Sequence, residues 1–180
     1  MKKIAVIFSG AGSNFEYLAQ NLDDIEIALA ITNNPHAGGI EIAKNHNIPF
    51  EIIDSSGFKI REEFDEVLVQ IIQKASVDLV VLAGFMRILT PVFTKQIKSI
   101  NLHPSLLPRH KGVKAIEKSY DDEYNDGGVS VHWVNNELDG GDIILQKVIL
   151  KDGLSFDEYH NEIKNIEKIA LCEVIKKILK

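Results

Sequence analysis

The stretch Val77-Asp78-Leu79-Val80-Val81-Leu82-Ala83 decides the fold class of this chain. It is a short run of valine and leucine, and such a run is typical of a strand that helices cover on both faces of a parallel sheet. The segment before it, Arg61 to Ala75, carries its apolar residues at the spacing of an amphipathic helix. A helix followed by a buried strand is the repeating step of an α/β protein, so the chain is predicted to build a parallel, doubly wound sheet.

The same alternation of strand and helix continues on the amino-terminal side. Short runs rich in Ile, Val and Ala are separated by segments with apolar residues at helical spacing. Strands are predicted over Lys3 to Phe8, Ile25 to Thr32 and Pro49 to Ile53, and helices over Asn14 to Asn21 and His36 to His46. The amino-terminal half is therefore expected to be Rossmann-like.

On the carboxy-terminal side the pattern changes. Gly128 to Val134 alternates apolar and polar residues, and Ile143 to Leu150 forms a further strand. Two neighbouring strands joined in this way are predicted to form an antiparallel hairpin appended to the sheet. Phe156 to Leu179 has apolar residues at helical spacing, so a long carboxy-terminal helix is expected to cover a sheet face. The predicted fold class is α/β, with a doubly wound, mostly parallel, twisted sheet.

Length and composition limit the classes of protein to which the chain can belong. Its 180 residues are predicted to form one domain. The formal charge of −6 disfavours nucleic acid as a partner, because binding to the phosphate backbone requires a basic surface. No apolar run approaches the roughly 20 residues of a membrane-spanning helix, and the apolar run after Met1 is too short for a signal-peptide core. We therefore expect a cytoplasmic protein without a membrane partner.

Cysteine and histidine usage argues against a disulfide or a metal centre. Cys172 is the only cysteine, and the six histidines contain no HExxH or comparable metal-ligand spacing. His132 lies in an apolar strand and is expected to bond within the structure. His36, His46, His110 and His160 are expected in loops or at the surface. The segment Arg109-His110-Lys111 is interpreted as a solvated basic loop.

Asn101 and His103 are the strongest candidates for chemistry. They lie two residues apart in the segment Ile100 to Pro108, so in a strand their side chains share one face. Asn101 could donate to a developing oxyanion while His103 handles a proton at the same centre, which suits acyl transfer. Pro104 ends the strand and places the pair at a carboxyl end, where open α/β sheets carry their active sites. On this pair alone, a structural histidine is an equally good interpretation.

The loop Ser9-Gly10-Ala11-Gly12-Ser13-Asn14 lies between the first predicted strand and the first predicted helix. Main-chain amides at such a junction, together with the helix dipole, form a pocket for an anion. Gly12 lets the backbone approach a ligand closely, and Ser13 and Asn14 can bond to the ligand or cap the helix. Phosphate is the expected ligand group, with an ordinary tight turn as the alternative. A dinucleotide is not expected, because Phe15 replaces the third glycine of the GxGxxG motif.

Two further segments could complete a site. Asp139 precedes two glycines between the last two predicted strands, and beside His103 it would favour the imidazolium form of that ring. Gly84 to Leu89 follows the central strand and offers an apolar surface with one cation, suitable for a flat heterocycle that carries carboxylates. The alternative interpretations are a hairpin turn and a strand leaving the core.

Together, these segments resemble the folate-dependent phosphoribosylglycinamide formyltransferases. The matching motifs are SGAGSN at Ser9 to Asn14, LAGFMRIL at Leu82 to Leu89, NLHPSLLP at Asn101 to Pro108, SVHWV at Ser130 to Val134 and LDGGDIILQ at Leu138 to Gln146. Their order and spacing span essentially the whole chain. The resemblance implies transfer of the formyl group of 10-formyltetrahydrofolate to the amine of 5-phosphoribosylglycinamide, a step of purine biosynthesis.

The resemblance also implies roles for individual residues. The implied catalytic residues are Asn101, His103 and Asp139. The implied ribonucleotide-binding residues are Gly12, Ser13, Asn14 and Glu167, and the implied folate-binding residues are Arg61, Met86, Arg87, Ile88, Leu89 and Asn101. Residues 1–100 would then form the phosphate-binding half and residues 101–180 the catalytic and folate-binding half. No metal is implied, and the expected assembly is a monomer or a weak homodimer.

The chain departs from the family pattern in two places. Lys111 to Ile116 lacks the histidine that the family often carries there, and Lys168 to Cys172 replaces the His and Tyr-Pro that often follow the family glutamate. A formyltetrahydrofolate hydrolase, a formyltransferase acting on another amine and a nucleotide-binding regulatory module are the alternatives. The hydrolase and the formyltransferase that acts on an aminoacyl-tRNA usually carry an additional domain, for which 180 residues have no room. The predicted phosphate loop further favours a ribonucleotide as the acceptor.

Overall fold

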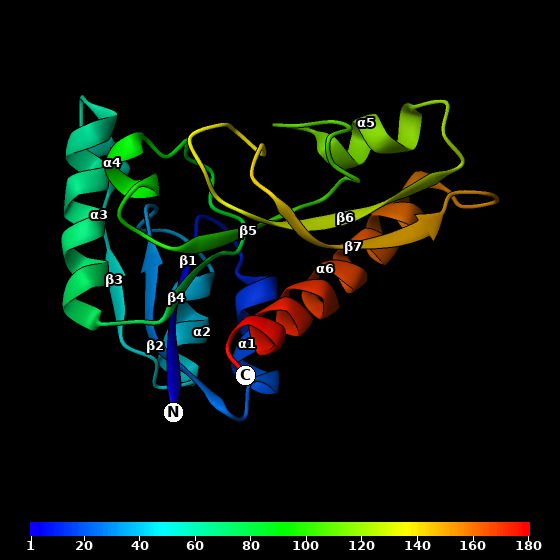
Figure 1. The fold of residues 1–180 in the computed structure, drawn as a ribbon. Helices are drawn as coiled ribbons and strands as arrows, with labels where there is room; N and C mark the ends of the chain where they lie inside the picture. Colours follow the sequence, from blue (N-terminus) through cyan, green and yellow to red (C-terminus); the bar gives the residue numbers. More distant parts are fainter.

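A seven-stranded mixed sheet forms the centre of the molecule (Figure 1). The computed structural model describes residues 1–180, and the strands follow the order β3-β2-β1-β4-β5-β6-β7. The strands are β1 (Lys2–Phe8), β2 (Ile25–Thr32), β3 (Phe50–Ile52), β4 (Leu79–Leu82), β5 (Ser99–His103), β6 (Asp126–Trp133) and β7 (Ile143–Leu150). The helices are α1 (Ser13–Asn21), α2 (Gly39–Asn45), α3 (Arg61–Ala75), α4 (Pro91–Thr94), α5 (Ala115–Asp121) and α6 (Phe156–Ile178), with a 3₁₀ turn at Ser55–Gly57.

Strand direction divides the sheet into two parts. Strands β1 to β5 pair in parallel, whereas β6 is antiparallel to β5 and β7 is antiparallel to β6. Strands β2 and β3 lie on one side of β1, and β4 and the later strands lie on its other side, so the order of the strands reverses between β1 and β4. In open α/β sheets, ligands bind beyond the carboxyl ends of the strands at such a switch point. The predicted fold class, a mostly parallel sheet with an appended antiparallel hairpin, is confirmed.

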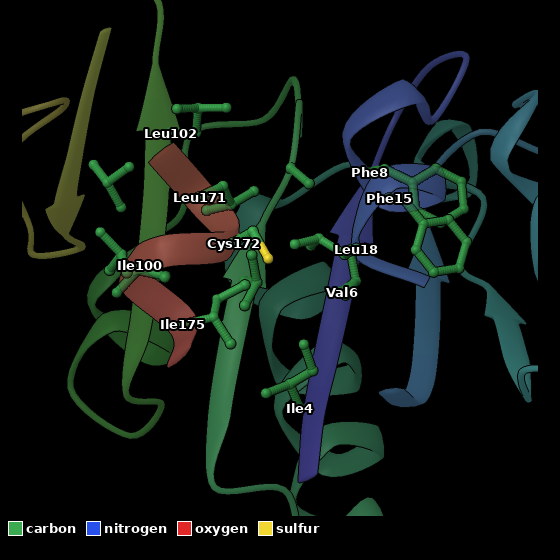
Figure 2. Packing of buried hydrophobic residues seen from close by; sticks show 14 of the residues in the cluster. Ile4, Val6, Phe8, Phe15, Leu18, Ile100, Leu102, Leu171, Cys172 and Ile175 are labelled. Atoms are coloured by element: carbon green, nitrogen blue, oxygen red, sulfur yellow. The ribbon is translucent and has the colours of Figure 1, made fainter. Parts of the chain in front are cut away.

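Two hydrophobic cores lie on opposite faces of the sheet, and β1 contributes to both. Ile4, Val6 and Phe8 pack with residues of α1, α2 and α6. Ala5 and Ile7 pack with residues of α3 and α4, because alternate side chains of a strand point to opposite faces. Figure 2 shows the first core, in which side chains of β1 meet side chains of α1, β5 and α6. The central strands are thus covered on both faces, as the valine and leucine run predicted.

Most predicted elements are present, and β2, β7 and α3 have the predicted bounds. Helix α2 begins later than the helix predicted from His36, because the side chain of Asn34 accepts the His36 N–H and forms an Asx turn. The strand predicted over 77–83 is shorter and spans Leu79–Leu82. Helices α4 and α5 were not predicted, and α4, with four residues, is too short to show a helical period.

Helix α6 is the longest helix, and it packs against α1, β6 and β7. Its start is fixed by a capping box, in which the Ser155 side chain accepts the Glu158 N–H and the Glu158 side chain accepts the Ser155 N–H. Lys176 and Lys177 in its last turn complement the helix dipole. None of the helices combines the length and the apolar character that crossing a lipid bilayer requires.

Candidate active site

Three neighbouring strands deliver functional segments to one edge of the sheet. Strand β1 leads into residues 9–12, β4 leads into residues 84–90, and β5 ends at His103. Ser9 joins the first two loops, because its hydroxyl accepts the Met86 N–H at 2.8 Å and its own N–H donates to the Gly84 carbonyl at 3.0 Å. The loops predicted to bind two different ligands are therefore physically connected.

Asn101, His103 and Asp139 lie together at this edge. Nδ1 of His103 is 3.4 Å from Oδ2 of Asp139, and Nδ2 of Asn101 donates to Oδ1 of the same carboxylate at 3.4 Å. The side chains of His103 and Asp139 are only 7% and 6% exposed, so their charges interact where little water can screen them. The structure thus brings all three predicted catalytic residues into one cluster.

Asp139 carries the negative charge of this cluster. Burial opposes ionisation of its carboxyl group, but the contacts with His132, the Gly112 N–H and His103 outweigh burial and hold the pKa of Asp139 below its ordinary value. The Gly112 N–H donates to Oδ2 at 2.9 Å. Asp139 is therefore ionised at neutral pH and places a fixed negative charge beside His103.

The loop between β6 and β7 turns tightly to bring Asp139 to the cluster. Asp139 adopts a left-handed backbone with φ of 50°, which aspartate tolerates better than most residues. Gly141 is required in the same turn, because a Cβ atom there would lie 1.7 Å from the main-chain oxygen of Trp133. The Asp-Gly-Gly sequence is thus a turn motif and also the means by which the carboxylate reaches β5.

His132 is a fourth member of the cluster, and the sequence did not assign it a functional role. It lies opposite Asn101 in the β5–β6 pairing. Its Nδ1 atom is 2.8 Å from the Trp133 carbonyl oxygen, and its Nε2 atom is 3.3 Å from Nδ2 of Asn101 and 3.6 Å from Oδ1 of Asp139. The contact with the Trp133 carbonyl holds the ring so that Nε2 faces both the amide of Asn101 and the carboxylate of Asp139. His132 therefore orients the amide of Asn101.

The other side of His103 faces the segment that follows the proline turn. Nε2 of His103 is 2.8 Å from the main-chain oxygen of His110. The N–H of Gly112, two residues further on, binds Asp139. Residues 110–112 therefore contact both members of the His103–Asp139 pair.

The interpretation of Arg109-His110-Lys111 as a solvated basic loop is wrong for its first two residues. The Arg109 side chain donates to Asp126 at 3.0 Å and is 22% exposed. Nε2 of His110 is 2.6 Å from Oδ2 of Asp122, and the His110 side chain is 23% exposed. Both side chains are held against the protein by acidic residues that are distant in the sequence. Local sequence patterns could not predict these contacts.

Gly12, Ser13 and Asn14 form the start of α1, where the sequence predicted a phosphate loop. Gly12 has a left-handed φ of 83°, and a Cβ atom there would lie 2.8 Å from Cα of Gly39 at the start of α2. Glycine is therefore needed for packing between two loops as well as for close approach of a ligand. Asn14 is buried, and its Oδ1 atom has no hydrogen-bond partner in the protein. Its Nδ2 group also makes no hydrogen bond within the protein, so the amide can donate from Nδ2 to a phosphate oxygen, while Oδ1 can accept from a ligand hydroxyl.

Glu167 lies in α6, the helix that packs against α1. Its side chain is 4% exposed and accepts a hydrogen bond from Lys164 at 3.1 Å. Lys164 lies one turn earlier and is 41% exposed, so the buried carboxylate is accompanied by an accessible cation. No hydrogen bond or ion pair links Glu167 to Asn101, His103 or Asp139.

The residues predicted for the folate site follow β4 and lie mainly at the surface. Met86 is 79% exposed and Ile88 is 49% exposed, whereas Leu89 packs into the core beside α3. The guanidinium carbon of Arg87 lies 4.2 Å from the ring centre of Phe64, which holds the loop against α3. The loop thus presents apolar side chains to the solvent while its ends are anchored.

Arg61 is the first residue of α3 and is exposed. It makes no hydrogen bond or ion pair within the protein, and no contact joins it to the catalytic cluster. A nearby residue of the same helix, Asp65, is buried and accepts the Thr90 N–H at 2.6 Å, which ties the 84–90 loop to α3. Burial raises the pKa of Asp65 above its ordinary value.

The arrangement supplies an amide donor, an imidazole and a carboxylate to one point. An amide donor can stabilise an oxyanion, and an imidazole oriented by a carboxylate can move a proton. No group of three or more His, Cys, Asp or Glu side chains is arranged to hold a metal ion. The chemistry that these groups support is acyl transfer.

Comparison with known proteins identifies the family to which this geometry belongs. The family model described as formyl transferase matches residues 2–175. A phosphoribosylglycinamide formyltransferase of Haemophilus influenzae is 41% identical over 152 residues, which are 81% of this chain and 72% of that protein. The chain belongs to the phosphoribosylglycinamide formyltransferase family. The resemblance inferred from the five sequence motifs is confirmed.

Solved structures of phosphoribosylglycinamide formyltransferases have the same fold. The structure from Campylobacter jejuni is 48% identical with a TM-score of 0.97, covering 99% of this chain and 98% of that chain. The structure from Streptococcus pneumoniae is 28% identical with a TM-score of 0.93, covering 100% of both chains. The human trifunctional purine biosynthetic protein adenosine-3 is 36% identical over 153 residues, which are 82% of this chain but 15% of that protein.

Proposed function

We propose that the protein transfers the formyl group of 10-formyltetrahydrofolate to the amine of 5-phosphoribosylglycinamide, giving formylglycinamide ribonucleotide and tetrahydrofolate. The observation that carries this proposal is the cluster that Asn101 forms with the buried side chains of His103 and Asp139 at the carboxyl end of β5. An oxyanion donor, a group that moves a proton and an orienting carboxylate are what formyl transfer between two nitrogen atoms requires. The family membership supports the same reaction in purine biosynthesis.

Asn101 acts on the tetrahedral intermediate of this reaction. The substrate amine attacks the formyl carbon, a new C–N bond forms, and the formyl oxygen becomes an oxyanion. The contacts of Asn101 Nδ2 with His132 and Asp139 are long, at 3.3 and 3.4 Å, so the amide can turn toward the oxyanion without losing strong bonds. Collapse of the intermediate then breaks the bond between the formyl carbon and N10 of the folate.

His103 moves the proton in the same reaction. The protonated ring stabilises the oxyanion and gives a proton to N10 of the departing folate, and the ring then takes up the proton that leaves the attacking amine. Asp139 orients the ring and balances its positive charge. Because the substrate amine is itself the nucleophile, no covalent enzyme intermediate is needed.

The two ligands bind to different segments beside this cluster in our proposal. The phosphate binds at Gly12, Ser13 and Asn14, and Glu167 contacts the ribose. The folate lies along Met86 to Leu89, with Arg61 at its anionic end. The anchored apolar loop and the unsatisfied amide of Asn14 support this division.

One assay separates this proposal from the related activities. Consumption of formyl folate is measured with and without phosphoribosylglycinamide, and we expect consumption only when the ribonucleotide is present. Consumption without any amine would identify a formyltetrahydrofolate hydrolase, and consumption with a different amine only would identify another formyltransferase. No consumption under any condition would favour a regulatory binding module.

We further propose a cytoplasmic enzyme that acts as a monomer or weak homodimer on small molecules, without nucleic acid or membrane partners. The formal charge of −6 supports the absence of a nucleic-acid partner. Sedimentation equilibrium over a range of protein concentrations measures the assembly.

Replacing Asn14 should weaken binding of the ribonucleotide specifically. Asn14→Ala removes a buried amide at the start of α1, and a hydrogen bond to a charged group contributes about 1.5–3 kcal/mol. We therefore expect KM for phosphoribosylglycinamide to rise by at least ~10-fold while KM for the folate stays nearly constant. Steady-state kinetics with each substrate varied in turn measure both values.

Asn21→Ala is the matched control, because Asn21 lies in the same helix at its other end and donates to the Tyr17 carbonyl at 2.8 Å. It should leave both KM values unchanged. If Asn14→Ala raised both KM values equally, Asn14 would have a structural role and the assignment would be wrong.

Replacing Arg61 should weaken binding of the folate in a salt-dependent way. Its exposed guanidinium, free of partners in the protein, can reach the carboxylates of the folate tail. Arg61→Ala should cost about 1–2 kcal/mol of binding free energy at low salt and less at high salt. Calorimetric titration of a non-reactive folate analogue at the two salt concentrations measures the loss.

Lys74→Ala removes an exposed cation at the other end of the same helix and should leave folate affinity unchanged. Equal affinity of wild type and Arg61→Ala at low salt would exclude Arg61 from the folate site.

A further inference from the structure

The ring of His103 has a second partner that the proposed mechanism does not use. Nε2 is 2.8 Å from the main-chain oxygen of His110, whereas Nδ1 is 3.4 Å from Asp139. A carbonyl oxygen only accepts, so Nε2 must carry a hydrogen for this shorter bond to exist. This arrangement keeps a hydrogen on Nε2 and leaves Nδ1 as the nitrogen that gains and loses the proton.

The carbonyl group of His110 is held in place by the side chain of the same residue. His110 has a left-handed backbone with φ of 55°, which is uncommon for a residue with a Cβ atom. Such a conformation persists where the surrounding structure enforces it. Here Nε2 of the His110 ring is bonded to Oδ2 of Asp122 at 2.6 Å. The side chain thereby anchors the backbone whose oxygen faces His103.

Asp122 is in turn held by Lys151. Nζ of Lys151 is 2.6 Å from Oδ1 of Asp122 and also donates to the Ser119 carbonyl at 2.7 Å, near the end of α5. The side chains of Lys151 and Asp122 are 9% and 11% exposed. Burial opposes ionisation of Asp122, but the bonds from Lys151, His110 and the Tyr124 N–H outweigh burial and hold its pKa below the ordinary value. A largely buried ion pair therefore gives His110 a fixed anionic partner.

We propose that His110 is a positioning residue for formyl transfer: anchored by Asp122 and Lys151, it aims its main-chain carbonyl at Nε2 of His103, so that Nδ1 faces Asp139 and the reacting atoms. This inference rests on the proposed function, in which His103 moves the proton. The same segment supplies the Gly112 N–H to Asp139, so a shift of residues 110–112 displaces both members of the pair. A misplacement of about 1 Å is enough to cost ~10²-fold in rate.

Nuclear magnetic resonance of the histidine rings tests this geometry independently of activity. Long-range correlation spectra of protein with ¹⁵N-labelled histidine show which ring nitrogen carries the hydrogen. In the wild type, His103 should keep a hydrogen on Nε2 across a pH titration, and His110→Ala should mix its two neutral tautomers. The exposed rings of His36 and His46 should keep their signals, and an unchanged circular dichroism spectrum of His110→Ala should show that the fold is intact. A neutral His103 with its hydrogen on Nδ1, or identical His103 signals in His110→Ala, would overturn the proposal.

Double-mutant kinetics test whether His110 acts through His103. His110→Ala should lower kcat by about 10-fold with little change in either KM. His110→Gln should recover most of the loss, because its amide can still donate to Asp122. In a His103→Ala background, His110→Ala should cause no further loss, since the group that it positions is gone.

Substitution of Lys151 provides a second variant that changes no residue of the segment 103–112. Lys151→Met should lower kcat in the same direction as His110→Ala. Lys147→Met is the matched control, because Lys147 lies in β7 shortly before Lys151 and pairs instead with Glu173 at 2.7 Å. It should leave kcat unchanged.

The outcomes distinguish this inference from the proposed function. Full turnover in His103→Ala would refute both. If His103→Ala is impaired but His110→Ala and Lys151→Met keep wild-type kcat, only the positioning role is refuted. The positioning role is also refuted if the double variant loses kcat by the full product of the two single losses. Should His110→Ala fail to fold, Lys151→Met decides by the same criteria in kinetics and in the His103 spectrum.

Discussion

His103→Ala is expected to lower kcat by about 10²–10⁴-fold, the range that a general acid or base contributes. The reason is that His103 is the buried group that moves the proton, with ionised Asp139 3.4 Å away. KM for both substrates should change little, because the ring acts on the reacting atoms and not on the phosphate or the folate tail. Steady-state kinetics with saturating ribonucleotide and folate measure the loss.

His46→Ala is the matched control, because His46 is exposed and lies at the end of α2, away from the cluster. It should keep wild-type kcat. If the loss of kcat in His103→Ala were no larger than in His46→Ala, His103 would have no part in proton transfer.

The second large effect is expected at Asn101. Asn101→Ala removes the amide donor from the carboxyl end of β5, and loss of one oxyanion donor costs about 10²–10³-fold in kcat. The variant should still bind a non-reactive folate analogue, since the bond in question forms fully only in the transition state. Comparison of kcat with the dissociation constant of the analogue separates the two contributions.

Asn45→Ala, which removes an exposed asparagine from α2, controls for general effects of such a substitution. An unchanged kcat in Asn101→Ala together with weaker binding of the analogue would mean that Asn101 only binds the folate. The oxyanion role would then be excluded.

The sequence predicted most helices and strands well, because the hydrophobic period and the order of the elements along the chain can be read locally. The strand over Ile25–Thr32 and the helix over Arg61–Ala75 were predicted with their bounds. The pair Asn101 and His103 was also accessible, because two residues of one strand share a face whatever the rest of the chain does. The short helix α4 was missed, since four residues do not reveal a period.

The contacts of the cluster could not be read from the sequence, because they join segments far apart in the chain. His132 reaches Asn101 only because β6 pairs with β5 in a register that sets these two residues opposite each other. Lys151 reaches Asp122 only after β7 has returned along β6. The residues offered Asp139 as a candidate partner of His103 with a hairpin turn as the alternative, and the family resemblance then implied its catalytic role.

The residue next to His132 gives the protein a built-in optical probe. Trp133 is the only tryptophan in the chain, and its main-chain oxygen bonds to the ring of His132, which in turn contacts Asn101. Its indole ring lies 5.0 Å from Nζ of Lys98, a charge that influences the energy of the excited state. Fluorescence excited selectively in tryptophan therefore originates from a single position, next in sequence to a residue of the cluster, and following it requires no attached label.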